Sequence, residues 1–394
     1  MNNSISKSNR ALRLLVVFLY VMATLTALIS LTGCNSGKVD VITYEDSKTW
    51  FHEDLACVSL NGKYGYVDKT GKVVIEPKYD YAFSFYNGLA AVVVDGKYGY
   101  IDKTGKYVIE PKYERASNFT DSLVPVKLMG QFGFIDNTGK MVINNRFDNA
   151  NAFSEDLAMV RINGKCGFID KTGKIVVNPL YDAAGDFNDG VAVVMKDMKF
   201  GYIDKEGNEV IGLQFDYAFS FADGIASVMV NGKYGFIDKT GKLVGTAQYD
   251  YLHYYTDDVA LFEVNSRIGF LDKEGKIVVN PLYDDALPSS EGLIAACMAG
   301  KWGFIDTTGK TAVGFDYDRC EQFSDGLALV QLGSKVGYID KTGKLVIDFL
   351  FEDGFEFHDG IAIVQSNGKF GFIDKTGKFV IEPKFDNVHL YLED

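Results

Sequence analysis

The amino-acid sequence predicts an all-β protein built from ten repeats of 34 residues, each a three-stranded antiparallel unit. Three observations predict this fold class. One glycine recurs every 34 residues through ten copies without insertion or deletion, short runs of apolar and aromatic residues flank it, and turn residues separate those runs. For the assembly of the units, the sequence favours an open curved or superhelical array, and a closed propeller-like ring is the alternative.

The first element of each unit is a strand centred on the repeat glycine. In Lys63–Asp68, the side chains of Tyr64 and Tyr66 point to one face of the strand, whereas Gly65 and Val67 point to the other. Both faces are apolar or bare, so we expect burial on both sides and a close backbone or ring beside the glycine. The ten repeat glycines are Gly65, Gly99, Gly133, Gly167, Gly201, Gly235, Gly269, Gly303, Gly337 and Gly371.

The second element is a strand joined to the first by a tight turn. Asp68 can accept backbone N–H bonds in this turn, and Gly71 can adopt the left-handed conformation that the turn needs. The strand Val73–Ile75 follows, and Pro77 cannot donate to a sheet ladder, which suits a sheet edge. Calcium binding is a weaker interpretation of these aspartates, because each turn offers one carboxylate between lysines.

The third element is a strand reached through a longer connection. An aromatic residue and an acid, Tyr79-Asp80 in the first copy, open this connection in all ten copies. The strand Leu89–Val93 follows, and Asp95-Gly96 forms the hairpin to the next copy. The copies align so that the array begins with this third kind of strand and ends after the second. Neither terminus is then needed to complete a unit at the other end, which favours the open array.

One copy carries the motif of a known repeat family. The stretch Lys301–Asp306 reads Lys-Trp-Gly-Phe-Ile-Asp and resembles the signature of the bacterial WG, or KWG, β-repeat family. The rest of that pattern recurs through residues 51–390, although the tryptophan is present only at Trp302 and other residues, such as Cys166, Ile268 or Val336, replace it elsewhere. The resemblance implies an all-β repeat protein, often exported in bacteria, and it supplies no enzymatic residues.

The N-terminal residues predict a lipoprotein signal peptide over residues 1–33. Basic residues precede the apolar run 14–29, which is too short to cross a hydrocarbon core of ~30 Å as a helix. Leu31-Thr32-Gly33-Cys34 resembles the lipobox of bacterial lipoproteins, which implies signal cleavage between Gly33 and Cys34 and lipidation of Cys34, with acyl chains such as palmitate. An uncleaved membrane helix is the alternative.

These boundaries divide the chain into four parts. We expect the signal peptide over 1–33, the lipidated cysteine and a tether over 34–50, the ten repeats over 51–390 and a tail over 391–394. A lipid anchor of this kind places the protein on the extracytoplasmic side of a bacterial cell envelope, attached to the membrane.

The net charge and the cysteine positions exclude several classes of partner and site. The net charge is −13, which disfavours nucleic acid because an acidic surface repels phosphate backbones. The cysteines after Cys34 fall at unrelated positions of the repeat, so we expect small buried side chains rather than disulfides or metal ligands. They are Cys57, Cys166, Cys297 and Cys320. No catalytic triad or phosphate-binding glycine loop stands out, so the sequence predicts neither an enzyme nor a cofactor.

The position sixteen residues after each repeat glycine varies most informatively between the copies. It follows the constant aromatic–acid pair, and in several copies it holds Tyr or Arg, which are favoured in recognition because they offer a large contact area with a polar tip. Neutral variation on a solvated loop is the alternative. The candidate binding residues are Tyr81, Arg115, Tyr217, Tyr251 and Arg319.

Together these features predict a lipid-anchored envelope protein whose repeat array is a non-enzymatic binding or scaffold module for protein partners. One alternative is a carbohydrate-binding module, in which tyrosines stack on cell-wall glycans. Another is an envelope glycoside hydrolase that uses two carboxylates of the connections. Glycan binding predicts tyrosines on one exposed ridge, protein binding predicts a mixture of Tyr, Arg and acid, and hydrolysis predicts a deep cleft that interrupts the repeat.

Overall fold

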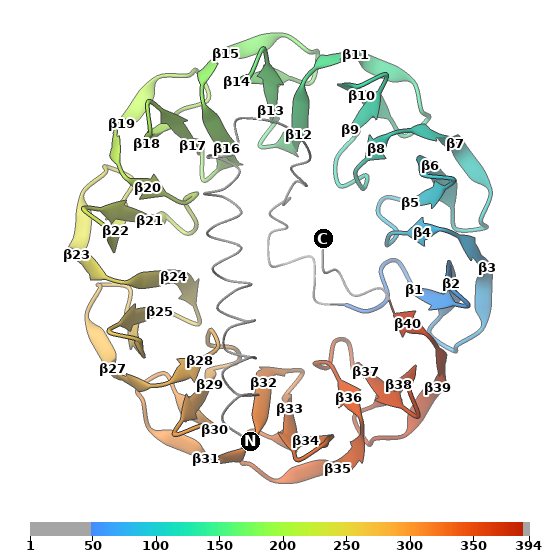
Figure 1. Ribbon diagram of the computed structural model, residues 1–394, viewed down its shortest axis with the longest axis vertical. Helices are drawn as coiled ribbons and strands as arrows, with labels where there is room; N and C mark the ends of the chain where they lie inside the picture. The colour runs from blue at the N-terminus through green and yellow to red at the C-terminus, as the bar shows by residue number, and fades with distance from the viewer. Residues whose placement is uncertain (1–48, 389–394) are drawn as a thin grey trace, which may run out of the picture. The chain divides into compact units, whose positions relative to one another are not determined.

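The computed structural model describes residues 49–388, which belong to one compact unit of the chain. The strands of this part form ten four-stranded antiparallel sheets, arranged as the blades of a closed ring (Figure 1). The signal peptide, Cys34 and the tail 391–394 lie outside the described residues. No helix within residues 49–388 is long and apolar enough to cross a membrane.

Each blade has four strands, ordered from the ring centre to the outer edge of the ring (Figure 1). The innermost strands are β4 (Tyr81–Ala82), β8 (Arg115–Ala116), β12 (Asn149–Ser154), β16 (Ala183–Asn188), β20 (Tyr217–Ala218), β24 (Tyr251–Thr256), β28 (Asp285–Ala286), β32 (Arg319–Ser324), β36 (Asp353–Gly354) and β40 (Asn387–Val388). The second strands are β1 (Leu55–Leu60), β5 (Leu89–Val94), β9 (Leu123–Leu128), β13 (Leu157–Ile162), β17 (Val191–Lys196), β21 (Ile225–Val230), β25 (Val259–Val264), β29 (Leu293–Met298), β33 (Leu327–Leu332) and β37 (Ile361–Ser366). The third strands are β2 (Lys63–Asp68), β6 (Lys97–Asp102), β10 (Gln131–Asp136), β14 (Lys165–Asp170), β18 (Lys199–Ile203), β22 (Lys233–Asp238), β26 (Arg267–Leu271), β30 (Lys301–Asp306), β34 (Lys335–Asp340) and β38 (Lys369–Asp374). The outermost strands are β3 (Val73–Tyr79), β7 (Tyr107–Tyr113), β11 (Met141–Phe147), β15 (Ile175–Tyr181), β19 (Glu209–Phe215), β23 (Leu243–Tyr249), β27 (Ile277–Tyr283), β31 (Thr311–Tyr317), β35 (Leu345–Phe351) and β39 (Phe379–Phe385). We number the blades 1 to 10 in the order of the repeat glycines, so that blade 1 contains β40, β1, β2 and β3.

The repeat glycine makes room for a bulge in the outermost strand. In blade 1, Tyr64 pairs with Tyr79 and Tyr66 pairs with Ile75, so three residues of β3 lie opposite Gly65 alone. A Cβ atom on Gly65 would lie 2.5 Å from the carbonyl oxygen of Ile75, and every repeat glycine shows a comparable approach of backbone atoms. The predicted close approach is therefore confirmed, and a side chain at this position would force the backbone of the outermost strand to shift.

The turn between the third and outermost strands is built as the sequence predicts. Oδ1 of Asp68 accepts hydrogen bonds from Thr70 N at 2.9 Å, Thr70 Oγ1 at 2.6 Å and Lys72 N at 3.1 Å. Gly71 has a φ of 80°, in the left-handed region. The hydrogen bond from the Thr70 hydroxyl lowers the pKa of Asp68. These aspartates cap the turns, as expected.

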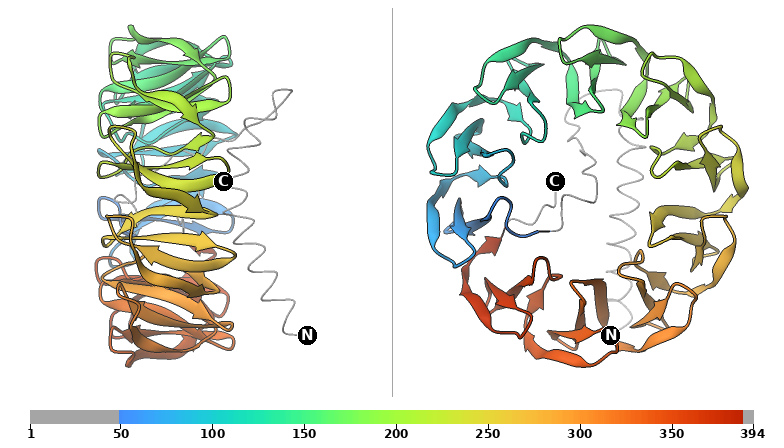
Figure 2. Two further views of the ribbon diagram at one scale, coloured as in Figure 1. Left: turned by 90° about the vertical axis from the view of Figure 1, so that its left-hand side faces the viewer. Right: turned by 180° about the vertical axis from the view of Figure 1, so that it is seen from behind.

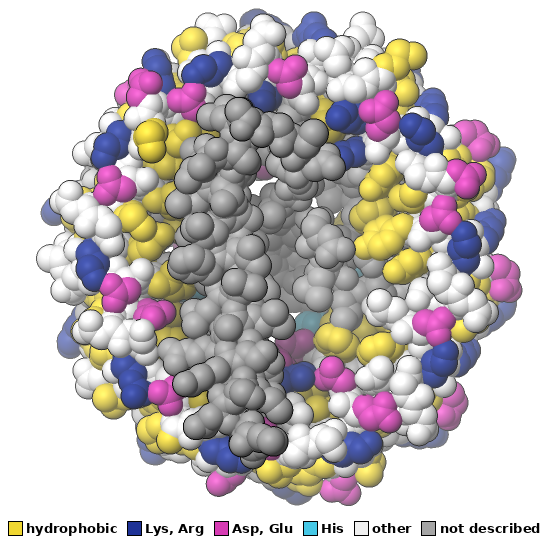
Figure 3. Space-filling model, viewed as in Figure 1, with side chains coloured by type: hydrophobic (Ala, Val, Ile, Leu, Met, Phe, Trp, Pro, Cys, Tyr) yellow, Lys and Arg dark blue, Asp and Glu magenta, His cyan; other side chains and the backbone are white. Residues whose placement is uncertain are grey.

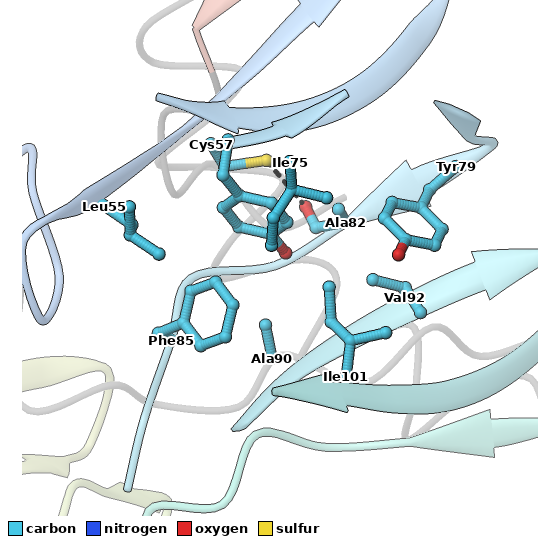
Figure 4. Close-up of a cluster of buried hydrophobic side chains, with 10 residues drawn as sticks. Leu55, Cys57, Ile75, Tyr79, Ala82, Phe85, Ala90, Val92 and Ile101 are labelled. Carbon is cyan, nitrogen blue, oxygen red and sulfur yellow. Dashed lines mark hydrogen bonds between the residues drawn. The ribbon is translucent and has the colours of Figure 1, made fainter. Parts of the chain in front are cut away.

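Neighbouring blades pack through apolar side chains. Between blades 1 and 2, Cys57, Ile75 and Tyr79 face Val92 and Ile101 in one buried cluster (Figure 4). The Cys57 thiol also donates to the carbonyl oxygen of Ala82, at 3.4 Å. All four cysteines of the described part are buried and none of them forms a disulfide there, which confirms their predicted role as small packing residues.

The turn glycines meet an isoleucine or valine side chain of the preceding blade at nine of the ten blade boundaries, and the exception is Gly275, whose Cβ position lies nearest the backbone oxygen of Val244, at 3.3 Å. The Cβ position of Gly105 lies 3.1 Å from the side chain of Ile75 in the preceding blade, and that of Gly71 lies 2.9 Å from Ile381 in blade 10. Blade 10 therefore meets blade 1 through the same contact that joins consecutive blades, as a closed ring requires.

Strand pairing closes the ring. The last strand, β40, pairs with β1 in blade 1, with Val58 opposite Val388 and Ser59 opposite Asn387. Trp50, which the sequence analysis places in the tether, adds a contact with blade 10, because its Nε1 donates to the carbonyl oxygen of Glu356 at 3.2 Å. Residues from both ends of the described part thus join the first and last blades.

The predicted open array of three-stranded units is therefore wrong, and the alternative, a closed ring, is correct. Residues just after the aromatic–acid pair, such as Tyr81–Ala82, form a fourth strand on the edge of the next blade. In blade 1, β40 fills this place. The two ends complete each other across one sheet, so the unit boundaries inferred from the sequence gave the wrong assembly. The protein is a ten-bladed β-propeller.

Candidate binding surface

The ring has two faces that differ in their loops. In blade 2, Val94 lies opposite Lys97 at one end of the β5–β6 pair, and Leu89 lies opposite Asp102 at the other end. The strands run between the two faces of the ring (Figure 2). We call the face that carries the tight hairpins such as Asp95-Gly96 the hairpin face, and the face that carries the Asp68-type turns the turn face.

The turn face is held together by one repeated set of contacts between blades. The carboxylate of Glu53 accepts a hydrogen bond from Gly88 N in the next blade at 3.1 Å, and it pairs with Lys103 at 3.0 Å. The carboxylate-to-glycine bond recurs at six blade boundaries, whereas between blades 2 and 3 the Asn87 amide donates to the carbonyl oxygen of Phe119 at 2.7 Å. The same carboxylate-to-glycine bond joins Glu155 to Gly190, Asp189 to Gly224, Asp257 to Gly292, Glu291 to Gly326 and Asp325 to Gly360.

On the hairpin face, the acid of the aromatic–acid pair ties consecutive copies together. The carboxylate of Asp80 accepts a hydrogen bond from Asp95 N at 2.7 Å and pairs with Lys63 at 2.5 Å, which lowers the pKa of Asp80. At the ring closure, Asp386 accepts from Asn61 N at 2.5 Å in the same way. Sequence reasoning noted this constant pair but missed its role. The bond recurs in Glu114–Gly130, Asp148–Gly164, Asp182–Asp197, Asp250–Asn265, Asp284–Ala299, Asp318–Gly333 and Glu352–Asn367.

The five candidate binding residues each begin the innermost strand of a different blade, directly after this acid. Arg115 is exposed, and the other four are half-buried. The structure therefore places them on the inner part of the hairpin face, which we call the rim, but distributes them around the ring rather than in one pocket. Tyr81, Arg115, Tyr217, Tyr251 and Arg319 lie in blades 2, 3, 6, 7 and 9, respectively.

Tyr81 lies at the centre of an aromatic cluster that bridges two blades. The centroid of its ring is 5.0 Å from that of Tyr64 in blade 1 and 5.0 Å from that of Phe83 in its own blade. The rings meet at steep angles, 55° and 72°. All three side chains are half-buried. We call these residues the Tyr81 cluster.

Tyr217 has the same surroundings between blades 5 and 6. Its ring centroid is 5.0 Å from Phe200 and 5.0 Å from Phe219, and we call these three residues the Tyr217 cluster. The aromatic row continues from Phe219 through Tyr234 to Tyr251 in blade 7, with centroid separations of 6.3 and 6.2 Å. A continuous row of ring contacts thus links Tyr217 to Tyr251.

Arg319 lies among carboxylates between blades 9 and 10. Its Nε is 2.9 Å from a carboxylate oxygen of Glu321, and its NH2 is 3.1 Å from one of Asp353. Burial raises the pKa of the neighbouring Glu356, and the negative charge of Glu321 adds to this shift. The two ion pairs hold the guanidinium in one position at the rim, and the two carboxylates offset its charge.

The rim therefore mixes aromatic, cationic and acidic side chains. Figure 3 shows acidic and basic side chains interspersed around the ring on the face that it displays, with hydrophobic side chains among them. Within the residues described, no group of three or more His, Cys, Asp or Glu side chains is arranged to hold a metal ion. Sequence reasoning found Tyr81 and Tyr217 but missed Phe83 and Phe219, which lie two residues further along.

The comparison with protein families identifies the repeat. The pattern described as "WG containing repeat" matches the chain ten times, and the matches cover most of its length. They lie at residues 64–98, 98–130, 132–166, 167–199, 200–234, 234–267, 268–302, 302–335, 337–370 and 370–394. A comparison with curated proteins finds no match.

Solved structures resemble the chain only distantly. A eukaryotic initiation factor is 12% identical, with a TM-score of 0.49 over 74% of this chain and 94% of that chain. BamB from Moraxella catarrhalis is 12% identical, with a TM-score of 0.34 over 79% and 91%. The dihydro-heme d1 dehydrogenase NirN in complex with DHE is 13% identical, with a TM-score of 0.40 over 81% and 75%. At these values the likeness carries no inference about function.

Proposed function

The chain belongs to the WG containing repeat family, and from this premise we propose that it is a non-enzymatic binding scaffold that holds protein partners on the rim of its hairpin face. A fold of this kind does not itself define a function, so the proposal rests on the surface rather than on the fold. The scaffold is the rigid ring, and the recognition elements are the side chains that begin the innermost strands.

The observation that carries the proposal is where the copies differ. The turn glycines, the capped turns and the acids of the aromatic–acid pair repeat with similar geometry in most blades. The rim position directly after the acid holds Tyr81, Arg115 and Arg319 in different blades. A constant framework with a varied, mixed aromatic and charged rim matches the composition of protein-binding surfaces, in which Tyr and Arg supply most of the binding energy.

The predicted lipid anchor would place this scaffold at a membrane. Cys34 follows a lipobox-like segment, and lipidation there would hold the ring on the extracytoplasmic side of a bacterial cell envelope. The tether would then let the rim meet partners at the envelope surface. The acidic net charge of −13 would steer basic partners toward it.

Glycan binding is the second candidate function, and the aromatic clusters favour it. Tyr81 and Tyr217 are half-buried rings at the rim, and tyrosine can stack on sugars. However, the rim also holds the Arg319 ion pairs with Glu321 and Asp353, and this mixture is what protein binding predicts. Protein partners are therefore the first choice.

Site-directed photocrosslinking tests the proposal. A benzophenone amino acid would replace Tyr81, Tyr217 or Tyr251 in the bacterium that makes the protein, and cells would be irradiated. We expect discrete protein adducts from these rim positions. The matched control is Val74 on the outermost strand β3, which is partly exposed but lies away from the rim.

Each outcome separates the candidates. Protease-sensitive adducts from the rim positions and none from position 74 support the proposal. Adducts that resist protease but are lost after glycosidase treatment support glycan binding instead. Equal adducts from the rim and from position 74, or none from the rim, contradict a binding rim of either kind.

A further inference from the structure

We propose that the ring carries two equivalent binding sites, the Tyr81 cluster and the Tyr217 cluster, each for a basic protein segment that presents an apolar or aromatic anchor. This inference rests on the proposed function and deepens it, because it fixes the number of sites and the chemistry of the partner. The sites lie four blades apart, so one ring would bind two such segments.

The sequence repeats itself at the two sites. Residues 80–85 and 216–221 both read Asp-Tyr-Ala-Phe-Ser-Phe. No other copy carries this six-residue sequence, and the copies differ mainly at its second, fourth and fifth positions, for example Glu-Arg-Ala-Ser-Asn-Phe at 114–119 and Asp-Ala-Ala-Gly-Asp-Phe at 182–187. Identity at two places, in a segment whose second, fourth and fifth positions vary between the copies, sets these two blades apart from the rest.

The geometry of the two sites is closely similar, although Phe200 takes the place of Tyr64 in the second site. Tyr81 meets its two aromatic neighbours at 55° and 72°, and Tyr217 meets its neighbours at 47° and 67°, with all four centroid separations at 5.0 Å. Both clusters bridge a blade boundary. A ligand group that fits one cluster will therefore fit the other.

The same buried supports hold both clusters. The hydroxyl of Tyr66 donates to the carbonyl oxygen of Phe83 at 2.6 Å, and that of Tyr202 donates to Phe219 at 2.7 Å. These hydrogen bonds hold the backbone of the innermost segment in place, and the tyrosine side chains that donate them are fully buried. The clusters are thus preorganised, which reduces the entropy lost on binding.

An ion pair borders each cluster. Lys63 pairs with Asp80 beside the Tyr81 cluster, and Lys199 pairs with Asp216 beside the Tyr217 cluster, at 2.5 and 2.7 Å. An aromatic centre with a charged border is the usual anatomy of a protein-binding hot spot. The partner must therefore supply an apolar anchor for the centre and charged groups for the border.

The ring geometry and the charge together select the partner. Each tyrosine ring packs at a steep angle against two other rings, so the cluster offers a ridged apolar surface rather than the broad flat face on which a sugar ring stacks. Tyrosine rings also attract Lys and Arg cations, and the net charge of −13 favours a basic partner. These observations commit the occupant to a basic protein segment.

Stoichiometry tests the inference. The full chain in a nonionic detergent would be titrated calorimetrically with the synthetic peptide acetyl-Arg-Phe-Arg-Phe-Arg-amide, against a detergent blank. We expect two equivalent sites per chain. Tyr81→Ala and Tyr217→Ala should each leave one site whose affinity changes by less than about twofold, because distant sites are independent, and the double variant should leave none. Ala183→Ser, at the same repeat position in blade 5, should keep both sites.

Two further arms keep the test decisive. Tyr81→Leu and Tyr217→Leu retain apolar packing, so they should lose a site even if the alanine variants fold poorly. The charge-reversed peptide acetyl-Glu-Phe-Glu-Phe-Glu-amide and the sugar cellopentaose should show no binding at these clusters.

Binding of the basic peptide that ignores both tyrosines, or that saturates at one site lost only with Tyr81, would overturn the twin sites while leaving the rim as a binding surface. Saturation by cellopentaose in place of the peptide would overturn the assigned partner. No binding of the basic peptide at either cluster would also overturn the inference. The photocrosslinking of the rim is a separate readout, so failure here and failure of the proposed function can be told apart.

Discussion

Two kinds of glycine act differently in each copy of the repeat. Gly65 has no space for a side chain, because the bulged strand β3 approaches its backbone. Gly71 instead has a φ of 80° and contacts the side chain of Ile381 across the ring closure. The first kind of glycine shapes a blade and the second kind lies where two blades meet. Substitution of the second kind should therefore destabilise the packing between neighbouring blades.

Replacing Gly173 by valine should destabilise the ring by about 2–4 kcal/mol. Gly173 has a φ of 84°, and a Cβ there would lie 2.9 Å from the side chain of Ile143 in the preceding blade. Backbone strain and overpacking of the blade boundary therefore add. The denaturation midpoint in urea measures the change.

Gly164→Val is the matched control. Gly164 lies in the hairpin of the same blade with a φ of 78°, but no atom lies within 4 Å of its Cβ position. It should cost about 1–2 kcal/mol from backbone strain alone. Equal midpoints for the two variants would contradict the contact between blades.

Only some residues of the two aromatic clusters could be identified as candidate binding residues from the sequence. Tyr81 and Tyr217 stood out in the sequence because their position varies between copies beside a constant acid. Phe83 and Phe219 did not stand out in the sequence, because a phenylalanine two residues after another aromatic residue is typical of a buried core position. Only the ring shows that they share a half-buried cluster with the tyrosines, although the repeated six-residue segment was a signal that could have found them.

Most strands followed from local chemistry, but one did not. The second, third and outermost strands and their turns match the predicted apolar runs and turn residues. The innermost strand escaped prediction because in several blades, as at Tyr81–Ala82, it has only two residues and shows no periodicity. Its place is set by the bond from Asp80 to the hairpin at Asp95, which joins residues of different units and has no local sequence signal.

The turns that link the strands should make the ring sensitive to acid. The Thr70 hydroxyl lowers the pKa of Asp68 through its hydrogen bond, and Lys63 lowers the pKa of Asp80. The pKa of an aspartate in the unfolded chain is about 3.9, so at a pH just below 3.9 the unfolded chain binds more protons than the native chain. This stabilisation is complete above about pH 5 and is lost as the pH falls through the lowered native values. The turn aspartates with the same shift are Asp102, Asp136, Asp170, Asp238, Asp306, Asp340 and Asp374.

We therefore expect the urea midpoint to be nearly constant between pH 6 and 8 and to fall steeply below about pH 4. The loss should persist in about 0.5 M salt, which screens general charge repulsion but does not restore the bonds to protonated carboxylates. A midpoint at pH 3 equal to that at pH 7 would show that the turn carboxylates do not stabilise the native ring.

The whole chain combines the ring with a predicted membrane anchor. Cys34→Ser should abolish membrane retention, because Cys34 is the predicted lipid acceptor and the apolar run before it is too short to span a membrane. Detergent phase partitioning of the expressed protein measures this. A serine variant that still enters the detergent phase would contradict lipid anchoring at this residue.

Ring closure is the feature of the whole molecule that was predicted wrongly from the sequence, because the repeats favoured an open array. The copies align as complete three-stranded units, yet blade 1 takes its fourth strand from the other end of the chain, through β40. Like the other innermost strands, β40 directly follows an aromatic–acid pair, so its local sequence does not indicate that it pairs with β1 at the other end of the described chain. Because the rim is formed by the innermost strands, its shape depends on this closure.

An engineered disulfide across the closure tests this account most directly. Ser59 and Asn387 lie opposite each other on β1 and β40, at a separation that antiparallel pairing makes suitable for a disulfide. Arg115→Cys with Lys127→Cys, a pair opposite each other within blade 3, is the control that forms whether or not the ring is closed. We predict that Ser59→Cys with Asn387→Cys oxidises within one chain as completely as the control pair and raises the urea midpoint. Thiols that stay reduced, or that link only different chains, while the control pair oxidises would contradict the closed ring.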